Sequence, residues 1–574
     1  MRRLWVICLS CSLIVLWTTG WFASPSSAPL SPHIFFSDIT SGPNIGGQNG
    51  QGAYVTIRGK RFGASQGNSY VTVGGQTASS YPIWTDSRIT FQLSSSARSG
   101  LIVVHAQGGS VESNGIPFTI RPGRIFCVST SGSDRNNGTF AQGCWASLYR
   151  ARSAMKAGDI TYAEDGVSEA GNDPRAYSSQ GESLTVRDWN GGGAHSATPS
   201  DPIAFVAYPG ATVTVGNPNK GYYGVRLLAA YWVLAGFKLR SVAIAVQLWS
   251  HDRLVNNDIS CPRGDGYVGC VLMSQATDVK LFGNNVHDVC ALAPCSKMYH
   301  SVYATTDSND IDIGWNTIGP DKSCRAIQFH SSPVNARTGY DQYGIFIHDN
   351  IIHDNPCDGI NLATVDPSKG PVEVYNNIIY NTGKGPMPPD GTASYAAIYS
   401  AGMTNRGKPG AGDILVYNNT LYNNGSGVGQ PGISASTAGA LAANNWAPNL
   451  IMKLVNNIIA QRPNEAYYSL STSVKNINGT NNLWSGSRVQ AAPSFTANNI
   501  LRPPHFVDRA ARDFHLMPGS PAIGAGVNTG VPTGRDGILR PRDKPYDLGA
   551  YQVPDPSAPA SQTLYPPVLQ PRPR

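Results

Sequence analysis

Short apolar runs, each closed by asparagine, recur along the second half of the chain. Eight such phrases lie between Asn256 and Asn482, and typical ones read VNNDIS, YNNIIYNT and YNNTLYNN. No apolar stretch has the period and length of an amphipathic helix, which excludes helical repeats. Short strands that end at a turn asparagine predict the coils of a β-solenoid, with the asparagines stacked from coil to coil. We centre the eight phrases on Asn257, Asn285, Asn316, Asn350, Asn377, Asn419, Asn457 and Asn482.

Four of the apolar runs align with one another in register: HSVY (300–303), CRAIQFH (324–330), CDGINLA (357–363) and YAAIYSA (395–401). The two-residue period of a strand predicts that one set of side chains points inward and the next set outward. We expect His330 outward, two positions beyond the outward row. The predicted inward stack is Val302, Ile327, Ile360 and Ile398, and the predicted outward row is Tyr303, Gln328, Asn361 and Tyr399.

Three charged or ionisable residues fall above one another where the chain enters these strands: His300, Arg325 and Asp358. Strict alternation would turn them towards the core. Buried and unpaired charges are costly there, so we expect the three to face a groove or one another.

Residues 32–121 follow a different pattern. Short alternating strands such as VTIRG, YVTVGG, ITFQL and LIVVHA are separated by Gly, Ser and Asn turns, which predicts a small antiparallel sandwich. The wording PHIFFSDITSGPNIGG, followed by YVTIRGKRFG and SNGIPFTI, resembles the IPT/TIG immunoglobulin-like module. The resemblance implies a spacer or presenting module, and we assign no chemistry to it.

The solenoid is predicted to extend from residue 124 to residue 552. SLYRARSAMKAGD predicts a short capping helix that ends at Gly158, and DITYA predicts the first strand. The opening phrase STSGSDRNNGT and the closing segment 513–552 resemble those of secreted right-handed parallel β-helix proteins, which implies an all-β fold of that type. Residues 553–574 are rich in proline and are expected to be a disordered tail.

The chain begins with a basic MRR, an apolar stretch and small residues, which predicts a secretory signal peptide over residues 1–28. An uncleaved membrane anchor is the alternative, and no other stretch has the apolar length of a membrane span. Eight cysteines follow the signal, an even number that suits an oxidising compartment. Metal binding is the alternative for them. The predicted disulfides are Cys127–Cys144, Cys261–Cys270, Cys290–Cys295 and Cys324–Cys357.

Charge adds one constraint on the partner. Only 14% of residues are charged and the formal net charge is +7, a mild bias towards an anionic polysaccharide. No basic run or basic helix accompanies this charge, which argues against nucleic acid as a partner. We expect an extracellular, periplasmic or cell-surface protein that acts as a monomer.

The aligned strands carry the candidate chemistry. Arg325 is suited to clamp a carboxylate or sulfate, and Tyr303 and Tyr399 to stack on sugar rings and donate hydrogen bonds. His300 or His330 is suited to transfer a proton, and Asp358 to orient an imidazole or to act itself. Gln328 and Asn361 complete a groove that suits a saccharide. Two long inserts, HDVCALAPCSKMYH and NTGKGPMPPDGTASY, are of the kind that wall a cleft.

Asp358-Gly359-Ile360 resembles the Asp-Gly-Ile phrase of β-helix polygalacturonases, which implies a catalytic Asp358. The rest of that family's signature is absent from the chain. No cofactor is required by any motif, although a calcium ion held by Asp307, Asp310 and Asp312 is conceivable.

Three functions follow from this groove. The first is a lyase that cleaves a uronate-containing polysaccharide by β-elimination. The second is a glycoside hydrolase, which needs a second carboxylate beside Asp358, supplied by a loop residue such as Asp307 or Asp366. The third is a glycan-binding or adhesive solenoid without catalysis. The irregular inserts favour a walled cleft over an adhesive surface, and we rank the lyase first.

Overall fold

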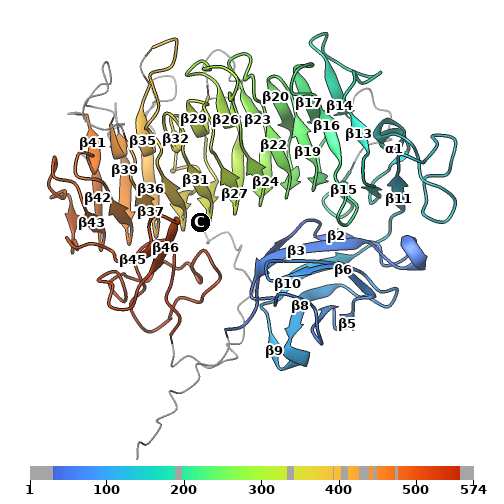
Figure 1. The fold of residues 1–574 in the computed structure, drawn as a ribbon, viewed down its shortest axis with the longest axis horizontal. Coiled ribbons are helices and arrows are strands. Elements are labelled where there is room, and N and C mark those ends of the chain that lie inside the picture. Colours follow the sequence, from blue (N-terminus) through green and yellow to red (C-terminus); the bar gives the residue numbers. More distant parts are fainter. Residues whose placement is uncertain are drawn as a thin grey trace, which may run out of the picture.

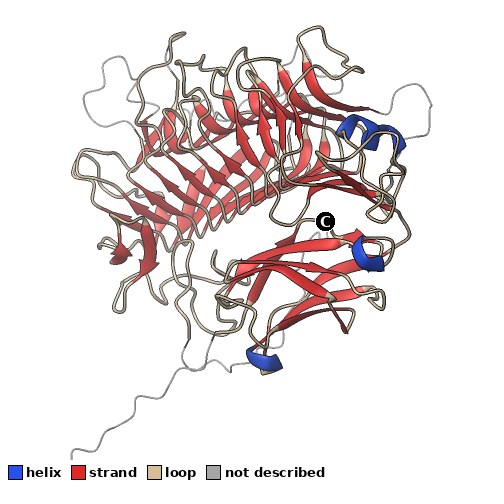
Figure 2. Ribbon diagram, turned by 45° about the vertical axis from the view of Figure 1, so that its right-hand side comes forward, coloured by secondary structure: helices blue, strands red, loops and turns tan. Residues whose placement is uncertain are grey.

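The computed structural model shows a small antiparallel β-sandwich followed by a long parallel β-helix and a short C-terminal segment (Figure 1, Figure 2). It describes residues 30–187, 197–331, 342–391, 393–401, 411–425, 438–443, 449–471 and 476–555. The predicted signal peptide and residues 556–574 of the predicted tail lie outside the described residues. The architecture confirms the all-β parallel β-helix and the sandwich before it.

Three parallel sheets run the length of the β-helix, and the chain visits them in turn. Sheet 1 consists of β11 (Ile125–Val128), β12 (Ile160–Ala163), β15 (Ile203–Ala207), β18 (Trp232–Ala235), β21 (Arg253–Val255), β24 (Thr277–Phe282), β27 (Asn309–Gly314), β30 (Ile345–His348), β33 (Val372–Tyr375), β36 (Ala411–Tyr417), β39 (Asn449–Val455), β42 (Ile477–Thr480) and β44 (Thr496–Ala497). Sheet 2 consists of β13 (Ser168–Glu169), β16 (Thr214–Gly216), β19 (Lys238–Arg240), β22 (Asp258–Ser260), β25 (Asn285–Val286), β28 (Thr317–Ile318), β31 (Ile351–His353), β34 (Ile378–Tyr380), β37 (Thr420–Tyr422), β40 (Ile458–Ala460) and β43 (Leu483–Ser485). Sheet 3 consists of β14 (Glu182–Arg187), β17 (Tyr223–Leu228), β20 (Ile244–Leu248), β23 (Gly269–Ser274), β26 (His300–Thr305), β29 (Arg325–His330), β32 (Ile360–Leu362), β35 (Tyr395–Ser400), β38 (Ala438–Ala443) and β41 (Tyr468–Leu470).

The sandwich has two sheets. One is formed by β1 (His33–Ser37), β3 (Tyr54–Lys60), β7 (Arg88–Gln92) and β6 (Ser80–Thr85). The other is formed by β2 (Ser41–Gly42), β10 (Ile116–Ile120), β8 (Gly100–Ala106), β4 (Tyr70–Val73), β5 (Gln76–Thr77) and β9 (Val111–Glu112), with short 3-10 turns at Gln48–Gly50 and Gln107–Gly109.

Buried asparagines form a continuous ladder at the corner between sheets 1 and 2. Asn316 is typical: its Nδ2 donates to the Leu281 carbonyl at 2.8 Å and to Asn350 Oδ1 at 3.0 Å. Its own Oδ1 accepts from the backbone and side-chain amides of the preceding ladder residue. Each rung thereby satisfies backbone groups that the bend would leave without partners. The ladder consists of Asn257, Asn284, Asn316, Asn350, Asn377, Asn419, Asn457 and Asn482.

One rung differs from the sequence prediction. The ladder residue of the GNNVHDV phrase is Asn284, and Asn285 is an exposed residue that begins β25. Every rung follows a residue with positive φ, which is Asn256 before Asn257 but Gly283 before Asn284. The glycine fills the left-handed position in this coil, so the first of the two asparagines, not the second, reaches the ladder.

The start of the solenoid also differs from the prediction. Helix α1 (Leu148–Ala154) ends before Gly158, and its N-cap is Ser147, whose side chain accepts from the Arg150 amide. The first strand of sheet 1 is β11, ahead of the helix, and the predicted DITYA segment supplies the second strand, β12. The Asp159 carboxylate explains the early end, because it accepts from the Lys156 and Arg124 amides and closes a turn there.

All four predicted disulfides are present. Cys324–Cys357 joins adjacent coils with a Cα separation of 4.7 Å, which matches the spacing of neighbouring strands. Within the described ranges, no helix is long and apolar enough to cross a bilayer.

Parts of two of the three outer faces of the β-helix are covered by other parts of the chain (Figure 1). The sandwich packs on the N-terminal half of sheet 1, where Phe36 meets Phe282 and the Tyr162 hydroxyl donates to the Tyr54 carbonyl at 2.7 Å. The C-terminal segment packs its hairpin, β45 (Phe506–Asp508) and β46 (Asp513–Leu516), on the C-terminal half of sheet 2. Arg61 of the sandwich donates to the Asp536 and Gly537 carbonyls and so links the two covers. Sheet 3 lies on the opposite side of the β-helix.

The interior ladder predicts a contrast between two neighbouring asparagines. Asn284→Ala should lower the free energy of unfolding by about 2–4 kcal/mol, because it leaves buried backbone and amide groups without partners. Asn285→Ala, one residue away and exposed, should change it by less than about 0.5 kcal/mol. Denaturant unfolding of the two variants measures both values. Equal losses would contradict the assignment of Asn284 as the rung.

Beneath the sandwich, His348 predicts a specific pH dependence of stability. Burial alone would lower its pKa, but the Asp312 and Asp349 carboxylates, 2.9 and 2.8 Å from its ring nitrogens, raise the pKa to about 10. Because the pKa of His348 is higher in the folded than in the unfolded protein, its protonation stabilises the fold. This stabilisation is complete below pH 6.5, near the unfolded-state pKa, and is lost as the pH rises to about 10. The melting temperature should therefore fall between these pH values, and fall less in His348→Gln. Parallel melting curves for both proteins would contradict the assignment.

Candidate functional site

The outer face of sheet 3 aligns the predicted outward row. Tyr303 pairs with Gln328, Gln328 with Asn361, and Asn361 with Tyr399 across four successive strands. Thr305 pairs with His330. The inward stack is also confirmed, because Val302, Ile327, Ile360 and Ile398 are in register and buried in the core.

The strand entries place His300, Arg325 and Asp358 side by side on this outer face. His300 pairs with Arg325, and the Ala326 amide bonds to the Asp358 carbonyl in the next coil. Ala326 and Ile327 are neighbours, yet both pack in the apolar core, so the inward and outward alternation breaks at this point. Arg325, the residue before them, therefore does not have to point inward. The expectation that these residues face one another is confirmed for Arg325 and Asp358.

Arg325 and Asp358 form a buried ion pair, with Nε and Oδ2 3.1 Å apart. The Asp358 side chain is fully buried, while 14% of the Arg325 side chain is exposed. Asp358 also accepts from the Asn361 amide at 2.9 Å, from the Ser394 hydroxyl and from the Ala396 amide at 3.0 Å. With its acceptor sites used in this way, Asp358 orients Arg325. No described histidine hydrogen-bonds to it, in contrast to the imidazole-orienting role considered from the sequence.

The Arg325 guanidinium is held by the protein at two of its three nitrogens. Its Nη1 donates to the Lys297 carbonyl at 2.9 Å, and Nη2 makes no hydrogen bond to any described residue. A guanidinium held at Nε and Nη1 is aligned in advance for an anion at its open edge.

Two long turns meet beside the strand entries of sheet 3. The turns 287–299 and 381–394 precede β26 and β35, while the turns of the two intervening coils, 319–324 and 354–359, are short. The long turns are joined at Asp390, which accepts from the Ser296 hydroxyl at 2.6 Å and the Lys297 amide at 2.8 Å. These are the inserts that the sequence predicts as cleft walls, and the structure joins them to each other.

Two supporting residues were missed by the sequence analysis. Ser394 is buried and donates to Asp358, and Tyr395 packs on the Cys324–Cys357 disulfide directly before Arg325 and Asp358. Ser394 precedes the YAAIYSA strand, so the alignment of strands offered no partner for it, whereas Tyr395 begins that strand and aligns with Cys324 and Cys357. The only sequence signal for a contact between Ser394 and Asp358 is that Ser394 lies two residues before Ala396, which aligns with Asp358.

Several buried polar atoms of this site have no hydrogen-bond partner among the described residues. They are His300 Nδ1, Gln328 Oε1 and Asn361 Oδ1. All three side chains are at least 95% buried: His300 and Asn361 are 2% exposed and Gln328 is 5% exposed. Buried polar groups are nearly always satisfied in folded proteins, so three unpaired polar atoms on neighbouring strands mark this part of sheet 3 as a candidate site.

Burial sets the protonation states of the site. Burial, reinforced by the Arg325 charge, holds the pKa of His300 well below 6.5 and lowers that of His330, so both imidazoles are neutral at neutral pH. Burial raises the pKa of the Tyr303 hydroxyl above 10, and the hydroxyl lies 3.5 Å from His330 Nδ1. Burial also raises the pKa of Asp358, against the opposing effects of Arg325, Ser394 and Asn361. The site thus combines two neutral bases with a protonated phenol.

The loop carboxylates do not join this cluster. Asp307 follows the far end of β26, and Asp366 follows the far end of β32, where it accepts from Ser368 and from the Ala411 amide. The length of β26 alone places that end about 16 Å from the strand entries. Asp312 bonds to His348 on sheet 1, and among the described residues no three His, Cys, Asp or Glu side chains gather to hold a metal ion.

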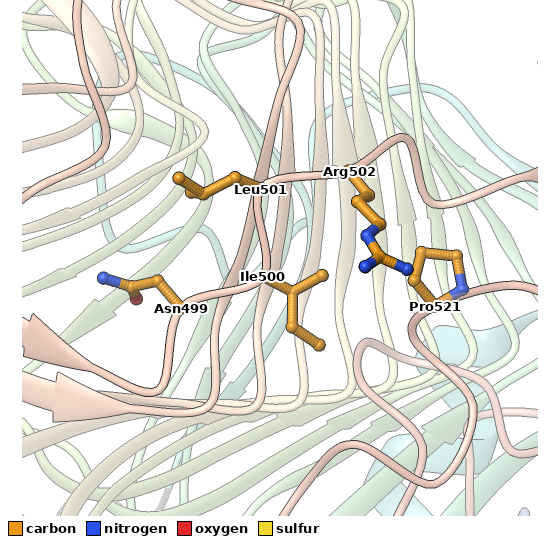
Figure 3. A pocket seen from close by; sticks show the side chains of 5 residues that line it. All are labelled: Asn499, Ile500, Leu501, Arg502 and Pro521. Atoms are coloured by element: carbon orange, nitrogen blue, oxygen red, sulfur yellow. The ribbon is translucent and has the colours of Figure 1, made fainter.

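A pocket of about 420 Å³ lies elsewhere, at the C-terminal end of the molecule (Figure 3). Its walls are Asn499, Ile500, Leu501, Arg502 and Pro521, with the Arg502 guanidinium next to Pro521. It contains none of the residues of sheet 3 and no acid or imidazole. The pocket therefore holds none of the candidate catalytic side chains.

Residues 35–120 match the model of the IPT/TIG domain, which confirms the module predicted for the sandwich. Comparison of the whole chain with curated proteins finds no match. The fold has relatives among solved structures. Pectate lyase Pel9A is 14% identical with a TM-score of 0.48, and covers 75% of this chain and 96% of its own.

An alginate lyase from Paenibacillus sp. is 14% identical with a TM-score of 0.33, and covers 57% of this chain and 94% of its own. A GH87 α-1,3-glucanase from Streptomyces thermodiastaticus is 12% identical with a TM-score of 0.33, and covers 75% of this chain and 79% of its own. Because all three TM-scores lie below 0.5, the chemistry must be argued from this chain's own side chains.

The arrangement predicts a coupling that NMR can measure. Arg325→Met removes the charge that helps to depress the imidazoles, so the pKa values of His300 and His330 should rise. Burial persists, so both should stay below 6.5. Titration of the imidazole resonances, assigned with His300→Gln and His330→Gln, gives the values. The exposed Lys322→Met is the matched control and should shift neither, and unchanged values in Arg325→Met would refute the site geometry.

Proposed function

We propose that this chain is a secreted polysaccharide lyase that cleaves a uronate-containing polymer by β-elimination. The observation that carries the proposal is the set of buried polar atoms without partners, on His300, Gln328 and Asn361, around the open edge of Arg325. They lie on sheet 3, away from the sandwich and the C-terminal segment. Disulfides in four places support an oxidising, extracytoplasmic compartment.

Arg325 binds the uronate carboxylate in this mechanism. The Nη2 edge meets the C6 carboxylate and offsets the negative charge that develops when the C5 proton leaves. Gln328 and Asn361 orient the sugar through its hydroxyl groups, which donate to Gln328 Oε1 and Asn361 Oδ1. Tyr399 lies next in the row and contributes a ring face to the same sugar chain.

Proton transfer is divided between His300 and Tyr303. Neutral His300 takes the C5 proton, the C4–C5 double bond forms, and the bond from C4 to the leaving oxygen breaks. The Tyr303 hydroxyl donates its proton to that oxygen, and it is reprotonated through His330, whose Nδ1 lies 3.5 Å away. The His300 and Tyr303 rings are in edge-to-face contact with centroids 4.8 Å apart, so base and acid reach one sugar unit.

Asp358 acts as a positioning residue. Its four protein contacts involve both oxygens and its side chain is fully buried, which argues against a role as nucleophile or acid. Hydrolysis would need a second carboxylate within about 10 Å, and the two loop candidates lie beyond the far ends of their strands. The residues therefore support elimination over hydrolysis.

Elimination leaves an absorbing double bond, which gives a direct test. Purified mature protein is incubated with polygalacturonate, alginate or hyaluronan while ultraviolet absorbance and new reducing ends are followed together. We expect both signals to rise with at least one polymer. Reducing ends without absorbance would identify a hydrolase and overturn the proposal. Neither signal on a broad panel would leave glycan binding as the function.

Variants then locate the reaction. Tyr303→Phe and His300→Gln should each lower kcat by about 10²–10⁴, the usual contribution of general acid or base groups. Arg325→Lys should also lose activity. The single nitrogen of a lysine cannot replace both the guanidinium nitrogens that the protein holds and the one that would face the substrate carboxylate. Tyr70→Phe in the sandwich is the control and should be fully active. Full activity of Tyr303→Phe and His300→Gln would place the reaction elsewhere.

A further inference from the structure

An apolar cluster lies on the outer face of sheet 3, in the coils that precede the candidate site. Ile244, Leu272 and Ala243 are buried at its centre. Around them pack side chains that are only partly buried, among them Tyr303 of the site itself. We call this surface the aromatic platform and define it as Tyr222, Tyr223, Val242, Ile244, Val268 and Leu272.

Strand register connects the platform to the site. Tyr223 pairs with Ile244, and Gly269, in the next coil, pairs with His300. Leu272 pairs with Tyr303. Tyr223 is thus three strand spacings from His300, about 14 Å along the helix axis. The same rows of the sheet therefore continue from the platform into the site without interruption.

Gly269 brings the two surfaces together. A Cβ at this position would lie 2.7 Å from the Tyr303 Cβ, so only glycine lets Tyr303 approach the platform so closely. Tyr303 then contacts His300 on one side and the platform on the other. One tyrosine belongs to both surfaces.

The platform rings are held in place before any ligand binds. The Tyr222 and Tyr223 rings meet edge to face, with centroids 5.0 Å apart. The Arg226 guanidinium lies 4.2 Å from the Tyr223 ring centroid and is itself fixed by Glu182 and, at 2.9 Å, by Gln247. Because Glu182 balances Arg226, the platform carries no free charge. Fixed rings lose little conformational entropy when a ligand stacks on them.

We propose that the aromatic platform is an additional binding site for the same polysaccharide, occupied by sugar units several residues away from the bond that is cleaved. This inference rests on the proposed function and extends it to substrate length. Sugar rings present apolar C–H faces that stack on tyrosine and aliphatic side chains, while their hydroxyls stay in water. Continuity with the site through Tyr303 identifies the occupant as the same chain.

The other side of the site is built differently. Beyond Tyr399 the outer row continues with Ala442 and Ser469, small side chains with no ring. Within the described residues the aromatic contribution therefore lies towards the N-terminal coils. A polymer should bind mainly from the cleavage point towards Tyr223. The exposed Tyr267, 72% accessible, follows Gly266, which lies against the Tyr222 hydroxyl.

Chain length supplies the test. Tyr223→Ala should raise KM for long polygalacturonate or alginate at least tenfold, with kcat unchanged and with no change in KM for the shortest oligomer that is cleaved. Tyr223→Phe keeps the ring and should match the wild type, as should Tyr70→Ala in the sandwich. Leu272→Ala should reproduce the KM effect in part. An equal change for long and short substrates, or none, would overturn the platform.

Binding without turnover separates this inference from the proposed reaction. The wild type and Tyr223→Ala are run in gels that contain polygalacturonate, alginate or hyaluronan, and their retardation is compared. Retardation of the wild type that is lost in Tyr223→Ala and kept in Tyr223→Phe supports the platform, even if no double bond forms in the assay. No retardation of the wild type by any of these polymers, or equal retardation of all variants, overturns it.

Discussion

The buried asparagine ladder is the constraint on which the rest of the molecule depends. A solenoid corner turns the backbone out of its sheet and leaves amides and carbonyls without strand partners, and each rung amide supplies those partners in two coils at once. A coil that slipped by one residue would bury unsatisfied polar groups along the whole corner. The ladder therefore holds residues 25 to 42 positions apart in one register, whatever the length of the inserts between them. Arg325 and Asp358 meet because Asn316 and Asn350 do.

Once the coils are in register, the faces of the helix are used differently. Sheet 1 and sheet 2 continue their apolar packing into the sandwich and the C-terminal segment, and Arg61 joins these two covers. Such covers hide the open faces that a bare solenoid would expose to other molecules. Sheet 3 instead carries polar and aromatic rows, and two of the long turns that lead into it are joined at Asp390. The sandwich is thus part of the scaffold, fixed to the β-helix by buried contacts such as Tyr162 with Tyr54.

The features that follow from the two-residue period of the strands could be predicted from the sequence. Features that depend on one residue at a turn, or on the fold of a long turn, could not. The apolar rows of HSVY and CRAIQFH determine which side chains point inward, so the row from Tyr303 to Tyr399 could be read from the chain. The rung at Asn284 was assigned one residue late, because Gly283 takes the left-handed position that the first asparagine fills in other Asn-Asn phrases. The hydrogen bonds of Ser394 and Asp390 depend on where long turns fold, and no short-range pattern specifies that.

The central ion pair compensates the charge of a buried arginine and leaves its Nη2 without a hydrogen bond to any described residue. A lone guanidinium at this depth would be costly, and a fully paired one would have no attraction left for an anion. Here Asp358 takes Nε and the Lys297 carbonyl takes one Nη1 proton, so the charge is compensated while the Nη2 edge stays open. In the proposed mechanism, a substrate carboxylate would meet an edge whose direction is already set. Ser394, Asn361 and the neighbouring disulfide fix the Asp358–Arg325 pair when the protein folds. Little conformational entropy of Arg325 then remains to be lost on binding.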